Sequence, residues 1–151
     1  MLDERSRFEA TRSDDSTFAC LVPGEPLGLR LMQRTFLKSK IHRATITEAL
    51  LHYEGSITVD RVLLELADIL VHEQVHIYNI TNGERFITYA IEGPPNSGVI
   101  CVNGAGARLV QPGDLIIICS YVQMETAAGQ ELKPKVILVD RENRALPQTQ
   151  D

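Results

Sequence analysis

The chain has 151 residues and a formal net charge of −5, from 15 Lys and Arg against 20 Asp and Glu. This length suffices for one domain with a buried core and is too short for two. The acidic balance and the lack of a basic run argue against nucleic acid as a partner. No apolar stretch reaches membrane-spanning length, and the start lacks the charged-then-apolar order of a signal peptide.

The first 31 residues show no pattern typical of a packed element. They mix Arg, Asp, Glu, Ser, Pro and Gly without a sustained period, which predicts a disordered N-terminal extension over residues 1–31. The three cysteines, Cys20, Cys101 and Cys119, share no CxxC spacing and are odd in number. We therefore expect free thiols and a location in the reducing cytoplasm.

Residues 34–48 are compatible with a β-strand, since Thr, Ile and Phe recur through them. On a strand, Lys40 and His42 share one face at roughly 6.6 Å, which would suit a small anionic ligand. A solvent-facing polar edge is the simpler reading, and the spacing alone favours it.

Gly55-Ser56 lies in a predicted loop and is a candidate for self-cleavage. A serine hydroxyl can attack the preceding carbonyl and replace the amide by an ester. Elimination then leaves dehydroalanine, which hydrolyses to a pyruvoyl group and ammonia. The attack needs a distorted backbone, which glycine permits, and a donor for the oxyanion on the Gly55 carbonyl. Most Gly-Ser pairs are ordinary turns, so the pair alone is a weak signal.

A helix is predicted after Asp60, which is a suitable N-cap. Apolar residues at helical spacing predict one buried stripe of Val62, Leu63, Leu66, Ile69 and Leu70.

The next segment, residues 72–76, reads His-Glu-Gln-Val-His and fits the HExxH zinc-peptidase motif. That chemistry needs one helix to carry both imidazoles. Residues 75–80 instead alternate like a strand and run into an Asn82-Gly83 hairpin turn. On a strand, His72 and His76 stand roughly 13 Å apart, too far to share one zinc ion. Because no later histidine offers a third ligand, no metal is expected.

The returning strand covers residues 85–91, and its period of two places Arg85 and Tyr89 on one face, about 13 Å apart. They could flank a ligand, although periodicity alone favours a half-buried sheet tyrosine. Further strands are predicted at 99–102, 115–122 and 135–140, with a helical turn within 125–131 and a polar tail over 141–151. The pattern indicates a mainly β protein, a small barrel with one or two short helices.

Several blocks in the same order resemble the pyruvoyl-dependent aspartate 1-decarboxylase family, from Met32 to about Asp140. The blocks are Arg34-Thr35, residues 38–43 (Lys-Ser-Lys-Ile-His-Arg), 51–56 (Leu-His-Tyr-Glu-Gly-Ser), 81–86 (Thr-Asn-Gly-Glu-Arg-Phe), 88–91 (Thr-Tyr-Ala-Ile), 102–105 (Val-Asn-Gly-Ala) and Gly113-Asp114. The resemblance implies a double-psi β-barrel over residues 32–140, cleaved between Gly55 and Ser56. It also implies decarboxylation of L-aspartate to β-alanine and CO2 for pantothenate and coenzyme A biosynthesis.

The same resemblance implies the cofactor and the partners. Ser56 would become a covalent pyruvoyl group, whose carbonyl can condense with the substrate amine and act as an electron sink. The family forms homotetramers with active sites between subunits. The sequence leaves open whether a maturation factor assists cleavage, and whether the protein starts at Met32.

The remaining roles are also carried over from the family. Arg85 and Lys40 would hold substrate carboxylates, and Tyr89 would be the proton donor. Backbone N–H groups of Gly104 and Ala105 would contribute to binding. The supporting residues would be Asn103, Thr88, Tyr53, His42 and Tyr78, the last of these standing where relatives often carry tryptophan.

Two other functions are weighed against this one. The first is a double-psi barrel that binds a small acid or a protein without catalysis and stays unprocessed. A binding module needs neither a cleavage site nor a proton donor. It is therefore disfavoured by the joint retention of Lys40, Tyr53, Ser56, Arg85, Thr88, Tyr89 and Asn103. The second is the zinc peptidase, which the strand pattern disfavours.

Overall fold

The computed structural model describes residues 32–147, which are dominated by β-strands. In chain order the strands are β1 (Gln33–Thr45), β2 (Glu48–Leu50), β3 (Ile57–Asp60), β4 (Gln74–Asn79), β5 (Arg85–Gly93), β6 (Ile100–Asn103), β7 (Leu115–Glu125) and β8 (Lys135–Leu138). The helices are α1 (Arg61–Ala67), the 3-10 helix η1 (Gly104–Leu109) and α2 (Thr126–Glu131). The predicted mainly β fold with short helices is confirmed. The extension expected over residues 1–31 lies outside the described residues.

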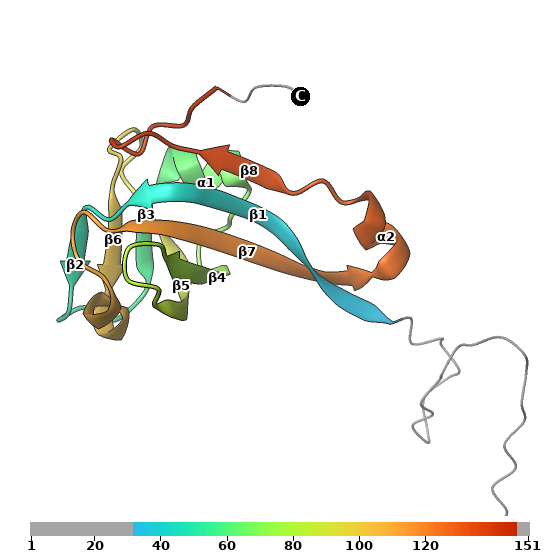
Figure 1. Ribbon diagram of the computed structural model, residues 1–151, viewed down its shortest axis with the longest axis horizontal. Helices are drawn as coiled ribbons and strands as arrows, with labels where there is room; N and C mark the ends of the chain where they lie inside the picture. The colour runs from blue at the N-terminus through green and yellow to red at the C-terminus, as the bar shows by residue number, and fades with distance from the viewer. Residues whose placement is uncertain (1–31, 148–151) are drawn as a thin grey trace, which may run out of the picture. The chain divides into compact units, whose positions relative to one another are not determined.

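The strands form one eight-stranded sheet in the order β2-β6-β3-β5-β4-β7-β1-β8. The longest antiparallel pairing, of β1 with β7, lies near one edge of this sheet, where β8 runs parallel to β1 (Figure 1). Alternate side chains of seven strands meet in one buried apolar cluster, which includes Ile41, Ile57, Ile77, Ile100 and Ile118. Because a flat sheet could not bring these strands to a common core, the sheet curls into a small barrel.

Helix α1 begins as predicted but buries a different face. Asp60 is its N-cap, accepting a hydrogen bond from the Val62 N–H at 2.9 Å. The predicted stripe is wrong at two positions, since Leu66 is 45 % exposed and Leu70 68 % exposed. Leu70 lies beyond the helix, which stops at Ala67 where Asp68 takes a left-handed conformation with φ 54°, and Leu66 lies on the side of the helix that does not face the core. Its buried residues are Leu63, Leu64 and Ala67.

The strand predicted over residues 75–80 is confirmed as β4, Gln74–Asn79, which pairs antiparallel with both β5 and β7. The turn between β4 and β5 is fixed by Asn79, whose side-chain oxygen accepts hydrogen bonds from the Thr81 and Asn82 N–H groups. The described α-helices have seven and six residues, too few to cross a membrane.

The segment after Asp140 makes more contacts than a polar tail would. Asn143 is only 2 % exposed. Its amide group donates to the Thr45 and Gly98 carbonyls, both at 2.8 Å, and accepts from the Thr45 N–H at 2.7 Å. The polar side chain is buried because it satisfies backbone groups of two separate segments.

Asp60 ties helix α1 to the loop between β5 and β6, which gives a stability prediction. Its Oδ2 accepts from the Gly98 N–H at 2.7 Å, and its Oδ1 accepts from the Asn96 N–H at 3.0 Å. In Asp60→Asn, the new NH2 group would face one of these two backbone N–H groups, and that hydrogen bond would be lost. We therefore expect the free energy of unfolding, measured in urea, to fall by about 2–3 kcal/mol.

A matched control for this change is Asp68→Asn. It removes only an exposed ion pair with Lys135 at 3.5 Å and keeps a residue that tolerates positive φ. We expect a change within about 0.5 kcal/mol. Equal effects of the two substitutions would contradict the structural role given to Asp60.

Candidate active site

Ser56 sits immediately before β3 in an unusual backbone conformation. Its φ is 93°, and that of Gly55 is 105°. A positive φ is uncommon for a residue with a Cβ and stores strain that the surrounding structure must hold. Ser56 is also only 2 % exposed. The predicted Gly55–Ser56 bond therefore lies in a distorted segment whose serine is buried.

Asn103, at the end of β6, holds Ser56 through both backbone and side chain. Its N–H donates to the Ser56 carbonyl at 2.9 Å. Its Nδ2 donates to Ser56 Oγ and to Thr58 Oγ1, each at 3.0 Å. The antiparallel register, with Ile57 opposite Val102, sets Ser56 and Asn103 against each other. The Ser56 hydroxyl therefore has a defined position.

The other end of the Asn103 amide is occupied by Cys101. The Cys101 thiol donates to Asn103 Oδ1 at 3.4 Å. Burial, reinforced by the Glu48 carboxylate, raises the pKa of Cys101, so the thiol stays protonated and can donate. Both ends of the amide thus have partners, and its NH2 group faces Ser56. The site roles of Cys101 and Thr58 were not predicted, although their period-two spacing from Asn103 and Ser56 is a signal that places them on the same faces.

The turn after β6 lies directly against the candidate cleavage bond. Gly104 has a φ of 66°. A Cβ there would lie 2.8 Å from both the Cα and the N of Gly55, and 2.9 Å from the Tyr53 carbonyl oxygen. Only glycine fits at this contact. Ala105 follows in η1 and is exposed, and the Tyr53 side chain is 54 % exposed.

Strand β5 brings two more predicted residues to this place. It runs parallel to β3, with Ile57 opposite Ala90. Tyr89 extends its hydroxyl over Gly55, 4.0 Å from where a Cβ on that glycine would lie. Thr88 lies on the same strand, directly before Tyr89 and two residues before Ala90, and is half-buried. We call Gly55, Ser56, Thr88, Tyr89, Asn103 and Gly104 the cleavage cluster.

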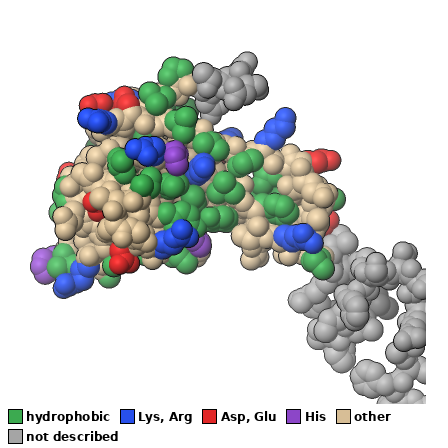
Figure 2. Space-filling view, viewed as in Figure 1, with side chains coloured by type: hydrophobic (Ala, Val, Ile, Leu, Met, Phe, Trp, Pro, Cys, Tyr) green, Lys and Arg blue, Asp and Glu red, His purple; other side chains and the backbone are tan. Residues whose placement is uncertain are grey.

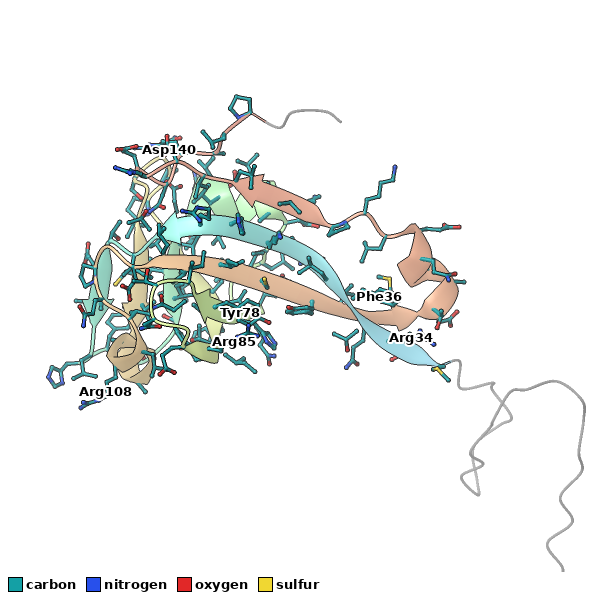
Figure 3. The ribbon with its side chains drawn as sticks, viewed as in Figure 1. Arg34, Phe36, Tyr78, Arg85, Arg108 and Asp140 are labelled. Atoms are coloured by element: carbon teal, nitrogen blue, oxygen red, sulfur yellow. The ribbon has the colours of Figure 1, made fainter. Side chains whose placement is uncertain are left out.

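The other predicted residues form a second group, which we call the cationic row: Lys40, His42, Tyr78 and Arg85. His42 pairs with Ile117, Ile117 with Tyr78, and Tyr78 with Arg85, so three of the four lie on one line across four strands. The Arg85 guanidinium lies over the Tyr78 ring, 4.8 Å from its centroid (Figure 3). Lys40 is two residues from His42 on the same face of β1.

His42 is the member of this row whose protonation is perturbed. Burial lowers the pKa of His42, and the neighbouring charges of Lys40 and Arg43 lower it further. Its Nδ1 is buried without a hydrogen-bond partner among the described residues. The imidazole is therefore neutral at physiological pH and leaves the positive charge of the row to Lys40 and Arg85.

The structure brings together the members of each group but does not join the two groups. Within residues 32–147, no hydrogen bond or ion pair links the cleavage cluster to the cationic row. Figure 2 shows Lys and Arg side chains spread among hydrophobic ones on the face in view. Ile87, between Arg85 and Tyr89 on β5, is 59 % exposed.

The His-Glu-Gln-Val-His segment has a structural role that the sequence did not reveal. Glu73 accepts hydrogen bonds from the Leu70 N–H at 2.9 Å, from Ser120 Oγ, and from Lys38, whose Nζ lies 2.7 Å from Oε1. Burial alone would raise the pKa of Glu73, but the Leu70, Lys38 and Ser120 hydrogen bonds outweigh it and hold that pKa below its usual value. Among the residues that the structure describes, no three His, Cys, Asp or Glu side chains could hold a metal ion.

Comparison with known proteins identifies the family of this chain. A family model described as aspartate decarboxylase matches residues 32–146, so the chain belongs to the aspartate decarboxylase family. A protein of Syntrophobacter fumaroxidans named aspartate 1-decarboxylase is 58 % identical over 117 residues, covering 78 % of this chain and 94 % of its own. One of the same name from Thermoanaerobacter pseudethanolicus is 59 % identical over 113 residues, covering 75 % and 97 %.

A third relative of that name, from Myxococcus xanthus, is 53 % identical over 116 residues, covering 77 % of this chain and 89 % of its own. Among solved structures, the rationally designed protein mkDPBB_sym_86 matches with a TM-score of 0.40 and 12 % identity, covering 54 % of this chain and 94 % of its own. That level of similarity decides nothing about this chain.

The lowered pKa of Glu73 gives a pH-dependent prediction. A carboxyl group whose pKa is depressed on folding stabilises the fold above its unfolded pKa, and that contribution is lost as the pH falls through the folded value. Glu73→Gln should therefore lower the free energy of unfolding by about 1–2 kcal/mol at pH 7, after allowance for partial exposure. The deficit should shrink below about pH 4, where the unfolded glutamate is protonated.

The measurement is urea unfolding of both proteins at several pH values. Glu92→Gln serves as the control, because Glu92 is exposed on β5 and should give the parent curve throughout. A Glu73→Gln deficit that stays constant down to acid pH would refute the assignment.

Proposed function

We propose that this protein cleaves its own chain at Gly55–Ser56 and then decarboxylates L-aspartate to β-alanine for pantothenate synthesis. Membership of the aspartate decarboxylase family supports this activity. The main support for cleavage at this bond is the hydrogen bond from the Asn103 side-chain amide to the hydroxyl of Ser56, a buried serine with positive φ. The buried free thiols of Cys101 and Cys119 support a reducing compartment, such as the cytoplasm.

Self-cleavage begins with attack of Ser56 Oγ on the Gly55 carbonyl carbon. A C–O bond forms, the C–N bond to Ser56 breaks, and the hydroxyl proton passes to the released amine, leaving an ester. Loss of the Ser56 α-proton expels the Gly55 carboxylate and gives dehydroalanine. Its enamine tautomerises to an imine, which water hydrolyses to a keto group and ammonia. The strained φ values favour the attack, because the ester relieves the constraint that holds this peptide.

The cleavage cluster is suited to this sequence of steps. Asn103 Nδ2 donates to Ser56 Oγ, which keeps the hydroxyl proton itself free to leave. Thr88 is half-buried on β5, the strand that pairs with β3 directly after Ser56, so its hydroxyl is our candidate donor for the oxyanion. Close contact of Gly104 with Gly55 and the Tyr53 carbonyl limits movement of the loop during the attack.

Ser56 is the residue that would carry the pyruvoyl group, which supplies an electron sink for the carbanion left by CO2 loss. The neutral polar surroundings of Ser56 fit such a group. Arg85 offers a planar guanidinium for a substrate carboxylate, and Lys40 adds a second positive charge. Tyr89, whose hydroxyl reaches over Gly55, would deliver a proton to the substrate α-carbon.

We further propose that a second copy of the chain completes each site within a homotetramer. In one chain, Arg85 and Tyr89 are four residues apart on β5, roughly 13 Å along the strand, and aspartate is much shorter than that. Ile87 between them is 59 % exposed, as expected for a surface that another copy covers. Arg85 and Lys40 of one subunit would then face the Ser56 of its neighbour.

The cleavage proposal predicts the masses of the purified protein. Denatured protein should give one fragment ending at Gly55 and another starting at residue 56, the latter lighter by one ammonia than a serine terminus. Ser56→Ala should give a single intact chain with no aspartate decarboxylation, because no hydroxyl can attack. Ser97→Ala, which removes a surface hydroxyl bonded to the Pro94 carbonyl, should be processed normally. Intact Ser56 in active protein would overturn the proposal and favour an unprocessed binding module.

The role given to Tyr89 is tested after processing. Tyr89→Phe should cleave fully, since no contact of its hydroxyl with Ser56 is needed for the attack. Its kcat should fall about 100-fold or more, within the usual range for loss of a general acid. The measurement is β-alanine formation per processed chain. A kcat equal to that of the parent would remove Tyr89 from the mechanism.

A further inference from the structure

Tyr121 on β7 is connected to the cationic row by a hydrogen bond that no sequence pattern suggests. Its hydroxyl lies 2.9 Å from the hydroxyl of Tyr78. The ring of Tyr78 in turn lies under the Arg85 guanidinium, with 4.8 Å between the ring centroid and Arg85 Cζ. A continuous line of contacts therefore runs from Tyr121 through Tyr78 to Arg85.

Arg85 depends on Tyr78 for its position. No carboxylate of the described residues 32–147 pairs with Arg85, and the side chain is exposed. An arginine with several rotatable bonds would sample many positions without such a contact. The face of Tyr78 is thus the surface on which the guanidinium is held ready for an anion.

Besides the Arg85 guanidinium, the Tyr78 side chain contacts Tyr121 through its hydroxyl and meets the His76 ring edge-on, with centroids 6.4 Å apart. A cavity of about 270 Å³ borders the pair. Its walls include Tyr78 and Tyr121 together with Thr35, Gln74, His76 and Gln123. The hydroxyl of Tyr121 is the only hydrogen-bond partner of the Tyr78 hydroxyl within the described chain.

Tyr121 is itself well fixed. Its backbone pairs with Leu37 in β1, and its ring packs edge-on against His76 with centroids 4.9 Å apart. The hydrogen bond to Tyr78, followed by burial, raises the pKa of Tyr121, so its hydroxyl stays protonated at neutral pH. The pair therefore persists across the range in which an enzyme would work.

We propose that Tyr121 is a positioning residue for substrate binding, acting on Arg85 through Tyr78. The inference rests on the proposed function, in which Arg85 holds a substrate carboxylate. Tyr121 touches neither the substrate nor the cleavage cluster. Its effect should consequently appear in substrate affinity and not in maturation or in the chemical step.

The first test compares Tyr121→Phe, Tyr78→Phe and the double variant, all fully processed. One lost neutral hydrogen bond predicts a rise of about two- to tenfold in KM for L-aspartate, with kcat within about twofold of the parent. The double variant should match the single ones, because both remove the same hydrogen bond. Additive effects, or a fall in kcat with unchanged KM, would overturn the inference. Ser97→Ala is the control for loss of an unrelated surface hydroxyl.

The second test does not depend on catalysis. The chain has four tyrosines and no tryptophan, so tyrosinate absorbance can be followed without interference. In the parent one tyrosine should ionise at clearly higher pH than the others, and Tyr78→Phe should lower that pKa. If the highest tyrosine pKa among the three that remain in Tyr78→Phe equals the highest in the parent, the pair does not form.

Binding of succinate, a dicarboxylate without an amine, separates the inference from the proposed function. If succinate binds Tyr121→Phe about two- to tenfold more weakly than it binds the parent, the positioning role is supported. This holds even if the parent does not decarboxylate aspartate, because that result would refute only the proposed activity. Equal binding to the parent and to Tyr121→Phe, with Arg85→Ala clearly weakened, would refute the positioning role alone.

Discussion

The contact between Asn103 and Ser56 is the constraint on which the candidate site depends. Backbone pairing of β3 with β6 sets these residues opposite each other, and the amide side chain adds a hydrogen bond to the serine hydroxyl. The next residue, Gly104, packs against Gly55 so closely that no side chain fits between them. The end of β6 and the turn that follows it therefore hold the two residues of the scissile bond.

The barrel core offsets the cost of this arrangement. A non-glycine residue at positive φ costs of the order of 1–3 kcal/mol. Directly after Ser56, Ile57 and Val59 are fully buried between β5 and β6, and burial of such side chains contributes about 1.5–3 kcal/mol each. The strand that follows the strained residue thus supplies enough packing to keep it in place. This explains why the serine lies next to a central strand and not in a free surface loop.

Local patterns predicted the parts of the structure that local forces decide. Asp60 as an N-cap, Asn82-Gly83 as a turn and the alternating strand after Val75 could all be read from the sequence, because each depends on neighbours within a few residues. The exposure of Leu66, the burial of Asn143 and the partners of Glu73 depend on segments brought together by the fold, so periodicity carried no signal for them. The predicted site residues came from the family resemblance. Spacing alone favoured a structural interpretation, a solvent-facing polar edge for Lys40 and His42 and a half-buried sheet residue for Tyr89.

The two groups of the site differ in charge, and this difference separates their chemistry. The cleavage cluster holds a serine, a threonine, a tyrosine, an amide and two glycines, so the attack on Gly55 takes place among neutral donors. The cationic row holds Lys40 and Arg85, with His42 kept neutral by burial and by the charges beside it. An anionic substrate needs the second group, whereas peptide cleavage needs only the first. Within residues 32–147 of one chain no hydrogen bond or ion pair joins the two groups, which fits the proposal that the row of one subunit serves the Ser56 of its neighbour.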